Sequence, residues 1–186
     1  MDTSNTPSNQ SGNTPIWSTI LRYGSYTAGA FVVFSLLTYL VNFNMMSFSG
    51  IAVLYGSILI IGFVLASMAI RYQRDQLDGG YISYGKALLV GSLTVLLGMF
   101  LSGFWNYVLI NFIDPNYVNT LKEQFLETWG GSMPPEALEQ ALEGFDKSGE
   151  LLSTLKSSLM GGVIFGLIVG LITAAFMKKQ PEMNIR

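Results

Sequence analysis

The chain contains no cysteine and no histidine, and it has few charged residues. These absences exclude disulfide bonds, thiol nucleophiles, haem ligation through histidine, zinc sites of the usual type and a histidine pH switch. Charged residues make up 12% of the 186 positions, whereas soluble domains usually carry about a quarter. Together with a hydrophobic fraction of 50% and a mean hydropathy of +0.43, this scarcity of charge indicates a membrane protein.

The long apolar runs lack proline altogether, and none has a charged residue in its middle third. They cover residues 20–41, 51–70, 87–113 and 159–177, each near or above the ~20 residues that a helix needs to cross ~30 Å of hydrocarbon. A soluble helical core is the alternative, but four such runs cannot all be interior in so short a chain. The runs therefore predict an all-α integral membrane four-helix bundle, with spans 1–3 inside 16–113 and span 4 at 158–179.

The two ends of the chain differ from these runs. Residues 1–15 are rich in Ser, Thr, Asn and Pro, so we expect a disordered tail there. No Lys or Arg precedes Arg22, and the first run is too long for a signal-peptide core, so it should remain in the mature protein as a span. Residues 180–186 form a second short tail, which we expect to be cytoplasmic.

Basic residues predict the orientation, because they remain on the cytoplasmic side of a membrane when they lie in short loops. Lys and Arg occur at the start of the first run, in the loop 71–86 and after the fourth run, but not in the loop 42–50. Both termini are therefore predicted to be cytoplasmic. The segment 114–157 is predicted to be extracytoplasmic, and its residues 114–150 carry eight acidic side chains against two lysines.

The extracytoplasmic segment has the pattern of an amphipathic helical hairpin. Asp114-Pro115 favours a first helix start, Gly130-Gly131 a stop, and Pro134-Pro135-Glu136 a second start. Apolar residues recur at three- and four-residue steps on both helices. The candidate partner-binding residues on these two stripes are Val118, Leu121, Phe125, Trp129, Leu138, Leu142 and Phe145. These apolar stripes must be buried, either against each other or against the ends of the spans, the membrane surface or a partner protein.

Small residues form one stripe along the fourth run, at Gly162, Gly166, Gly170 and Ala174. Such spacing lets two helix backbones approach closely in a membrane. The stripe is a candidate helix-packing surface, either against another span of the same chain or between two copies in a homo-oligomer.

The sequence has little that points to catalysis or coupled transport. Ionisable residues inside a membrane normally mark function, and the centres of these runs contain none. Ser83 and Lys86 are the nearest approach to a nucleophile–base pair, but Lys86 is explained more simply as a basic anchor at the interface. We expect no enzyme activity, no cofactor, no metal site and no nucleic-acid partner.

The loop between the second and third runs holds the most distinctive string, RYQRDQLDGGYISYGKA. Asp78-Gly79-Gly80 predicts a tight turn, and Ser83 can cap the third span. The candidate loop-motif residues are Arg71, Arg74, Asp78, Gly79, Gly80, Tyr84 and Lys86. This string, the Asp-Pro after the third run and the glycine-rich last run resemble the bacterial four-span family catalogued as domain of unknown function 4199, over about residues 17–179.

The resemblance implies a multi-pass protein of the bacterial inner membrane and supplies no activity or catalytic residue. Members of the family are often encoded beside membrane-associated glycosyltransferases, which implies one such enzyme as a partner. Our leading hypothesis is a non-enzymatic accessory, scaffold or assembly subunit that acts through protein or lipid contacts. The alternative is a small transporter or a lipid- or ion-handling protein, which a water-filled cavity reaching Asn106 or Lys86 would favour and a dry, close-packed bundle would reject.

Overall fold

The computed structural model describes residues 15–179, and six α-helices account for most of them. The helices are α1 (Trp17–Leu40), α2 (Phe48–Tyr72), α3 (Tyr84–Val108), α4 (Tyr117–Trp129), α5 (Pro135–Lys147) and α6 (Leu151–Met177). Within the described part of the chain there is no strand, only one antiparallel bridge between Ile82 and Lys179. The predicted tails, residues 1–15 and 180–186, lie outside the described residues except for Pro15.

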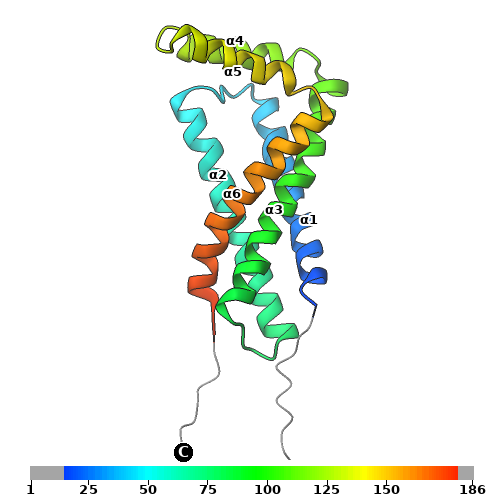
Figure 1. Ribbon diagram of the computed structural model, residues 1–186. Coiled ribbons are helices and arrows are strands. Elements are labelled where there is room, and N and C mark those ends of the chain that lie inside the picture. Colours follow the sequence, from blue (N-terminus) through cyan, green and yellow to red (C-terminus); the bar gives the residue numbers. More distant parts are fainter. Residues whose placement is uncertain (1–14, 180–186) are drawn as a thin grey trace, which may run out of the picture.

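Helices α1, α2, α3 and α6 are long and apolar enough to cross a membrane, so the predicted four-span, all-α fold is confirmed. Figure 1 shows these helices as a bundle, with α4 and α5 lying across one end of it. We call this the hairpin end. At the opposite end, the terminal end, α1 begins, α6 finishes and the chain turns from α2 into α3 (Figure 1).

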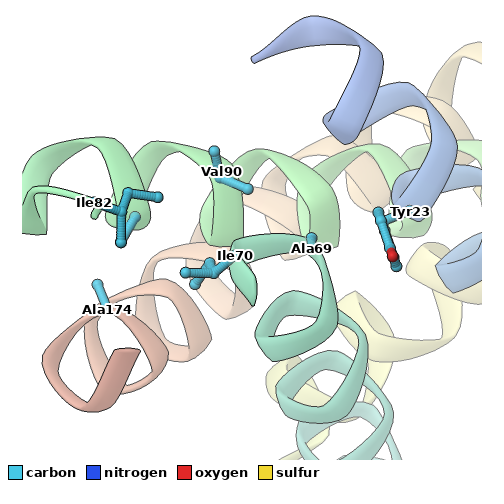
Figure 2. Close-up of a cluster of buried hydrophobic side chains, with 7 residues drawn as sticks. Tyr23, Ala69, Ile70, Ile82, Val90 and Ala174 are labelled. Carbon is cyan, nitrogen blue, oxygen red and sulfur yellow. The ribbon is translucent and has the colours of Figure 1, made fainter. Parts of the chain in front are cut away.

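The buried core lies in the half of the bundle nearer the terminal end. Figure 2 shows Ile70 of α2 between Val90 of α3 and Ala174 of α6, with Ile82 of the loop beside them. Ile70, Val90 and Ala174 are fully buried. Lipid tails are as apolar as these side chains, so close van der Waals packing holds the helices together rather than a hydrophobic driving force.

Several predicted start and stop signals act as expected. Ser83 caps α3, with its hydroxyl accepting a hydrogen bond from the Lys86 backbone N–H at 3.3 Å. Gly79 and Gly80 both have positive φ, at 65° and 91°, so the tight turn is confirmed.

Asp114 differs from its predicted role as a helix cap. Helix α4 begins at Tyr117, and the Asp114 carboxylate accepts a hydrogen bond from the Asn116 N–H at 3.0 Å, as in an Asx turn. At the other end of the hairpin, α6 begins at Leu151, so the last part of the predicted extracytoplasmic segment is the first two turns of the fourth span helix.

Two π-helical turns that the sequence pattern did not indicate extend the ends of α2 and α3. They are η1 (Gln73–Leu77) and η2 (Leu109–Ile113). In each, an aspartate N–H closes the turn onto a carbonyl five residues earlier: Asp78 to Gln73 at 2.9 Å, and Asp114 to Leu109 at 2.8 Å. Single π-helical turns of this kind often occur at functional sites. Each places an aspartate at a junction between a span and the structure that follows it.

Candidate functional site

The stripe of small residues on α6 faces α3 within the same chain. A Cβ added at Gly166 would lie 2.7 Å from the Ser92 carbonyl oxygen, and one at Gly162 would lie 3.1 Å from that of Leu96. Gly170 is buried at the same interface, and Ala174 is fully buried in the core beside α2 and α3. This pair of helices makes the most extensive contact in the bundle. A second copy could use the stripe only by displacing α3.

Two of the loop-motif residues, Asp78 and Lys86, form a polar cluster with Thr19 and Gln73 at the terminal end, which we call the terminal cluster. The Thr19 hydroxyl of α1 donates to the Gln73 amide oxygen at 2.6 Å, and the Gln73 amide nitrogen donates to Asp78 at 3.2 Å. Lys86 of α3 forms an ion pair with Asp78 at 2.8 Å. Asp78 is only 6% exposed and Lys86 22%, so this ion pair is largely shielded from water. The cluster joins α1, η1 and α3.

A second set of bonds joins the same loop to the end of α6. Arg74 donates to the Met177 carbonyl at 3.3 Å, where a cation is favourable at a helix C-terminus. Ile82 and Lys179 exchange two backbone hydrogen bonds, at 2.9 and 3.1 Å.

The predicted loop motif therefore consists largely of residues that hold the helices together. Arg74, Asp78 and Lys86 make cross-links, Gly79 and Gly80 form the turn, and Arg71 and Tyr84 are exposed.

A cavity of about 290 Å³ lies toward the hairpin end of the bundle, and we call it the hairpin-end cavity. All four membrane helices, the loop before α2 and helix α4 contribute to its wall. Its apolar lining includes Phe31, Phe34, Met45, Leu54, Ile58 and Met99. Its polar lining includes Ser35, Ser102, Asn106, Tyr117 and Ser158. No charged side chain is among the described residues that line it.

Helix α4 forms one wall of this cavity and is held at both of its ends. At its start, the Tyr117 ring packs edge-on against Tyr39 of α1, with 5.5 Å between centroids. At its end, the Trp129 indole packs 4.7 Å from Phe48 of α2 and donates to the Met46 carbonyl at 3.0 Å. Leu121, between these anchors, lines the cavity. Helix α4 therefore connects the ends of α1 and α2 through its side chains.

The two stripes of the hairpin are only partly covered. Phe125 and Phe145 contact each other at 5.5 Å, and Lys122 forms an ion pair with Asp146, so α4 and α5 meet along one edge. None of the described residues of α4 or α5 is fully buried, Val118 included. Leu138 and Leu142 line a surface hollow on α5, next to Glu139 and Glu143.

Charges are segregated between the two ends of the molecule. Acidic side chains dominate the hairpin end, while the described part of the terminal end carries Arg22, Arg71, Arg74, Lys86, Lys178 and Lys179 against Asp75 and Asp78. On the hairpin, a hydrogen bond from Lys147 to Glu143 raises the pKa of that lysine. Burial raises the pKa of the Tyr117 phenol, which therefore stays neutral beside the cavity at physiological pH. Among residues 15–179, no group of three acidic side chains is placed to hold a metal ion.

Sequence reasoning missed most of the residues that make these sites. Gln73 is fully buried, yet it lies in a string of charged residues that reads as an exposed loop. The cavity residues on α1 and α2 look like ordinary lipid-facing positions. Asn106 and Leu121 are the two cavity residues that the sequence analysis names, and the pair Met45-Met46 carries a further signal, because methionines are common at adaptable binding surfaces.

Comparison with known proteins gives a family and nothing more specific. No curated protein and no solved structure matches the chain. The family model described as protein of unknown function (DUF4199) matches residues 22–179, which include α1 from Arg22 onward, the other three membrane helices and the hairpin. The chain therefore belongs to the DUF4199 family, as its loop string and glycine-rich last helix predict.

Proposed function

We propose that this protein is a non-catalytic membrane component that binds one apolar chain of a lipid in the hairpin-end cavity. The observation that carries the proposal is the cavity itself, with a volume of about 290 Å³ and a mostly apolar wall. Small-molecule sites in proteins span roughly 300–1,000 Å³ and have this composition, with a few polar groups among apolar ones. A single chain fits a cavity at the lower limit of that range.

The location of the cavity supports a lipid as the ligand. Most of its wall is built from helices that are long and apolar enough to span a membrane, so we expect hydrocarbon chains of lipids to surround this part of the bundle. Phenylalanine rings and methionines give an apolar surface, and the flexible methionines can follow the contour of a chain. Ser102, Asn106 and Tyr117 offer hydrogen bonds without charge, which suits an uncharged part of a lipid headgroup or its ester groups.

The charge-free lining argues for a binding role over ion-coupled transport. A coupled transporter generally has a carboxylate or a broken helix at its substrate site. The described cavity wall has no carboxylate, and the shielded ion pair Lys86–Asp78 lies at the opposite end of the bundle. The cavity reaches Asn106, whereas the transporter alternative requires a water-filled cavity and this wall is mostly apolar.

Filling the cavity tests the proposal. In the variant Ile58→Trp the indole would occupy part of the volume, so lipid retention should fall by on the order of tenfold, the effect of ~1.4 kcal/mol. The measurement is native mass spectrometry of the full chain released from a mild detergent. Ile60→Trp, on the exposed face of the same helix, is the matched control and should retain lipid like the wild type.

Two results would overturn the proposal. One is a mass spectrum in which the wild-type protein retains no bound lipid after the detergent has been removed. The other is equal lipid retention in Ile58→Trp and Ile60→Trp when circular dichroism shows both to be folded.

A second candidate function is docking of a membrane-protein partner on the hairpin. The observation that favours it is the incomplete cover of the α4 and α5 stripes, above all the hollow at Leu138 and Leu142 beside three acidic side chains. A partner with a basic rim around an apolar contact would fit that surface. The family resemblance suggests a glycosyltransferase. Purification in mild detergent that yields only monomer, with no stoichiometric partner, would count against this function.

A further inference from the structure

A groove on the lipid-facing side of the bundle, at the terminal end, combines an apolar wall with a cation. It lies between α2 and the end of α6, has a volume of about 240 Å³, and we call it the α2–α6 groove. Its lining comprises Phe63, Val64, Ser67, Met68, Arg71 and Met177. Phe63, Val64, Met68 and Arg71 are exposed, so no part of the described chain covers the groove.

The charge of Arg71 is not balanced by a carboxylate bound to it. Asp75, one turn further along, is held by Arg74 through two hydrogen bonds, at 2.6 and 3.0 Å. Asp78 is held by Lys86. The Arg71 guanidinium forms no ion pair or hydrogen bond with any residue of the described 15–179 range, although its charge acts on Asp75 over a longer distance. Lys178 and Lys179 follow directly at the end of α6, so the surroundings of the groove are basic.

Ser67 provides a second, independent observation. It is 9% exposed, and its hydroxyl lies buried in the groove wall without a hydrogen-bond partner. A serine on a membrane helix ordinarily bonds to the carbonyl four residues earlier, as Ser25 does to Leu21 at 2.8 Å. A buried hydroxyl that lacks this bond is costly, so rotation of the Ser67 side chain toward an acceptor in the groove would be stabilising.

We infer that the α2–α6 groove binds an anionic glycerophospholipid. The phosphate accepts hydrogen bonds from the Arg71 guanidinium, an ester carbonyl accepts one from the Ser67 hydroxyl, and an acyl chain lies along Phe63, Val64 and Met68. Ser67 precedes Arg71 by four residues, which is about 6 Å along the helix axis. A phospholipid places its ester groups below its phosphate by a similar step, so the order of the side chains matches the order of the lipid's functional groups.

The observations favour an anionic lipid over a zwitterionic one. A guanidinium forms paired hydrogen bonds with phosphate oxygens. A choline headgroup would bring its own cation close to Arg71, Lys178 and Lys179, whereas a headgroup with net negative charge would not. An isolated phosphate ion would use Arg71 alone and leave both the apolar wall and Ser67 without a role.

The test measures lipid selectivity in the full chain. The wild-type protein, purified in detergent, is mixed with equimolar phosphatidylglycerol and phosphatidylcholine of identical chains, and bound lipid is counted by native mass spectrometry. Phosphatidylglycerol should be retained preferentially. Arg71→Gln should reduce that preference by on the order of tenfold, the loss of one charge-assisted contact. Ser67→Ala should weaken retention of both lipids, because the ester groups are common to them.

Arg22→Gln is the matched control. Arg22 lies at the same end of the bundle and is exposed, but its guanidinium stacks over the Tyr72 ring at 5.2 Å and does not line the groove. It should leave the preference unchanged. Equal retention of the two lipids by the wild type would overturn the inference. An equal loss of the preference for phosphatidylglycerol in Arg22→Gln and Arg71→Gln would also overturn it, because it would indicate diffuse electrostatic attraction. Displacement of the lipid by an excess of glycerol phosphate would overturn it as well, because it would indicate a site for phosphate alone.

Discussion

At the residue scale, Asp78 is the side chain on which most of the terminal end depends. It accepts hydrogen bonds from Gln73 and Lys86, and its own backbone N–H closes the π-helical turn η1. Gln73 of η1 and Lys86 of α3 thus meet at one carboxylate, and Thr19 of α1 is linked to it through Gln73. A shielded ion pair of this kind adds little net stability over apolar packing, but loss of one partner leaves the other charge without compensation.

Asp78→Asn should therefore destabilise the bundle by about 2–3 kcal/mol, less than a fully buried pair would lose because Lys86 keeps some access to water. Unfolding of the purified protein in detergent by denaturant, followed by circular dichroism, measures the change. The double variant Asp78→Asn/Lys86→Met should recover part of the loss, since it removes the orphaned charge as well.

Asp75→Asn is the control for Asp78→Asn, because Asp75 pairs with Arg74 at the surface and should contribute under about 1 kcal/mol. Destabilisation as large in Asp75→Asn as in Asp78→Asn would show that surface charge, and not the terminal cluster, supports the fold.

At the scale of elements, the α3–α6 pair is the most closely packed part of the bundle. The glycines of α6 bring its backbone within contact distance of the Ser92 and Leu96 carbonyls. The neighbouring atoms are backbone, which cannot rotate away as a side chain can. Any added Cβ must push the two helices apart, so this contact sets the geometry of the whole bundle.

Gly166→Ala should cost about 1–3 kcal/mol of stability, as overpacking of a tight interior generally does, even though alanine is the better helix former. Gly56→Ala on α2 is the matched control, because nothing lies within 4 Å of a Cβ at that position, and it should be neutral or slightly stabilising. Thermal unfolding in the same detergent compares the two variants.

Equal stability of the Gly166 and Gly56 variants would contradict the close approach of α3 and α6. Cross-linking of the same samples addresses the stripe as a homo-oligomer seam, which stays a prediction. A dimer that Gly166→Ala abolishes while the monomer remains folded would support that seam.

At the scale of the whole molecule, charge and shape are polarised along the bundle axis. The acidic hairpin of α4 and α5 lies at one end of the bundle, and the basic loop between α2 and α3 lies at the other with the end of α6. The two proposed lipid contacts are separated in the same way, with an uncharged cavity near the hairpin and a basic groove near the termini.

The predicted orientation, with both termini cytoplasmic, can be measured directly because the natural chain has no cysteine. Ser132→Cys, in the exposed loop between α4 and α5, should react with a membrane-impermeant maleimide in intact cells of a bacterial expression host. Gln76→Cys, exposed at the terminal end, should react only after the membrane is opened. The reverse pattern would mean that the basic residues do not determine the orientation in this protein.

The sequence alone is enough to predict that the protein lies in a membrane, that it has four spans, and that a polar segment separates the third span from the fourth. These follow from the local composition of the chain, because a run of some 20 apolar residues needs no partner to be recognised as a span. The positive φ of Gly79 and Gly80, the Ser83 cap and the stop after Trp129 are local in the same sense. Each depends on residues within a few positions of one another.

Which helix surfaces meet can be learned only from the tertiary structure, because the contacts join residues that are far apart in the sequence. The stripe of α6 could face any neighbour, and its contact with Ser92 of α3 depends on how two distant segments cross. Gln73 and Thr19 are 54 residues apart, and the cavity takes its wall from all four spans and α4. Inside a membrane, apolar composition is the same for lipid-facing and helix-facing positions. Hydropathy therefore cannot tell them apart, and shape and hydrogen bonding between distant residues make the choice.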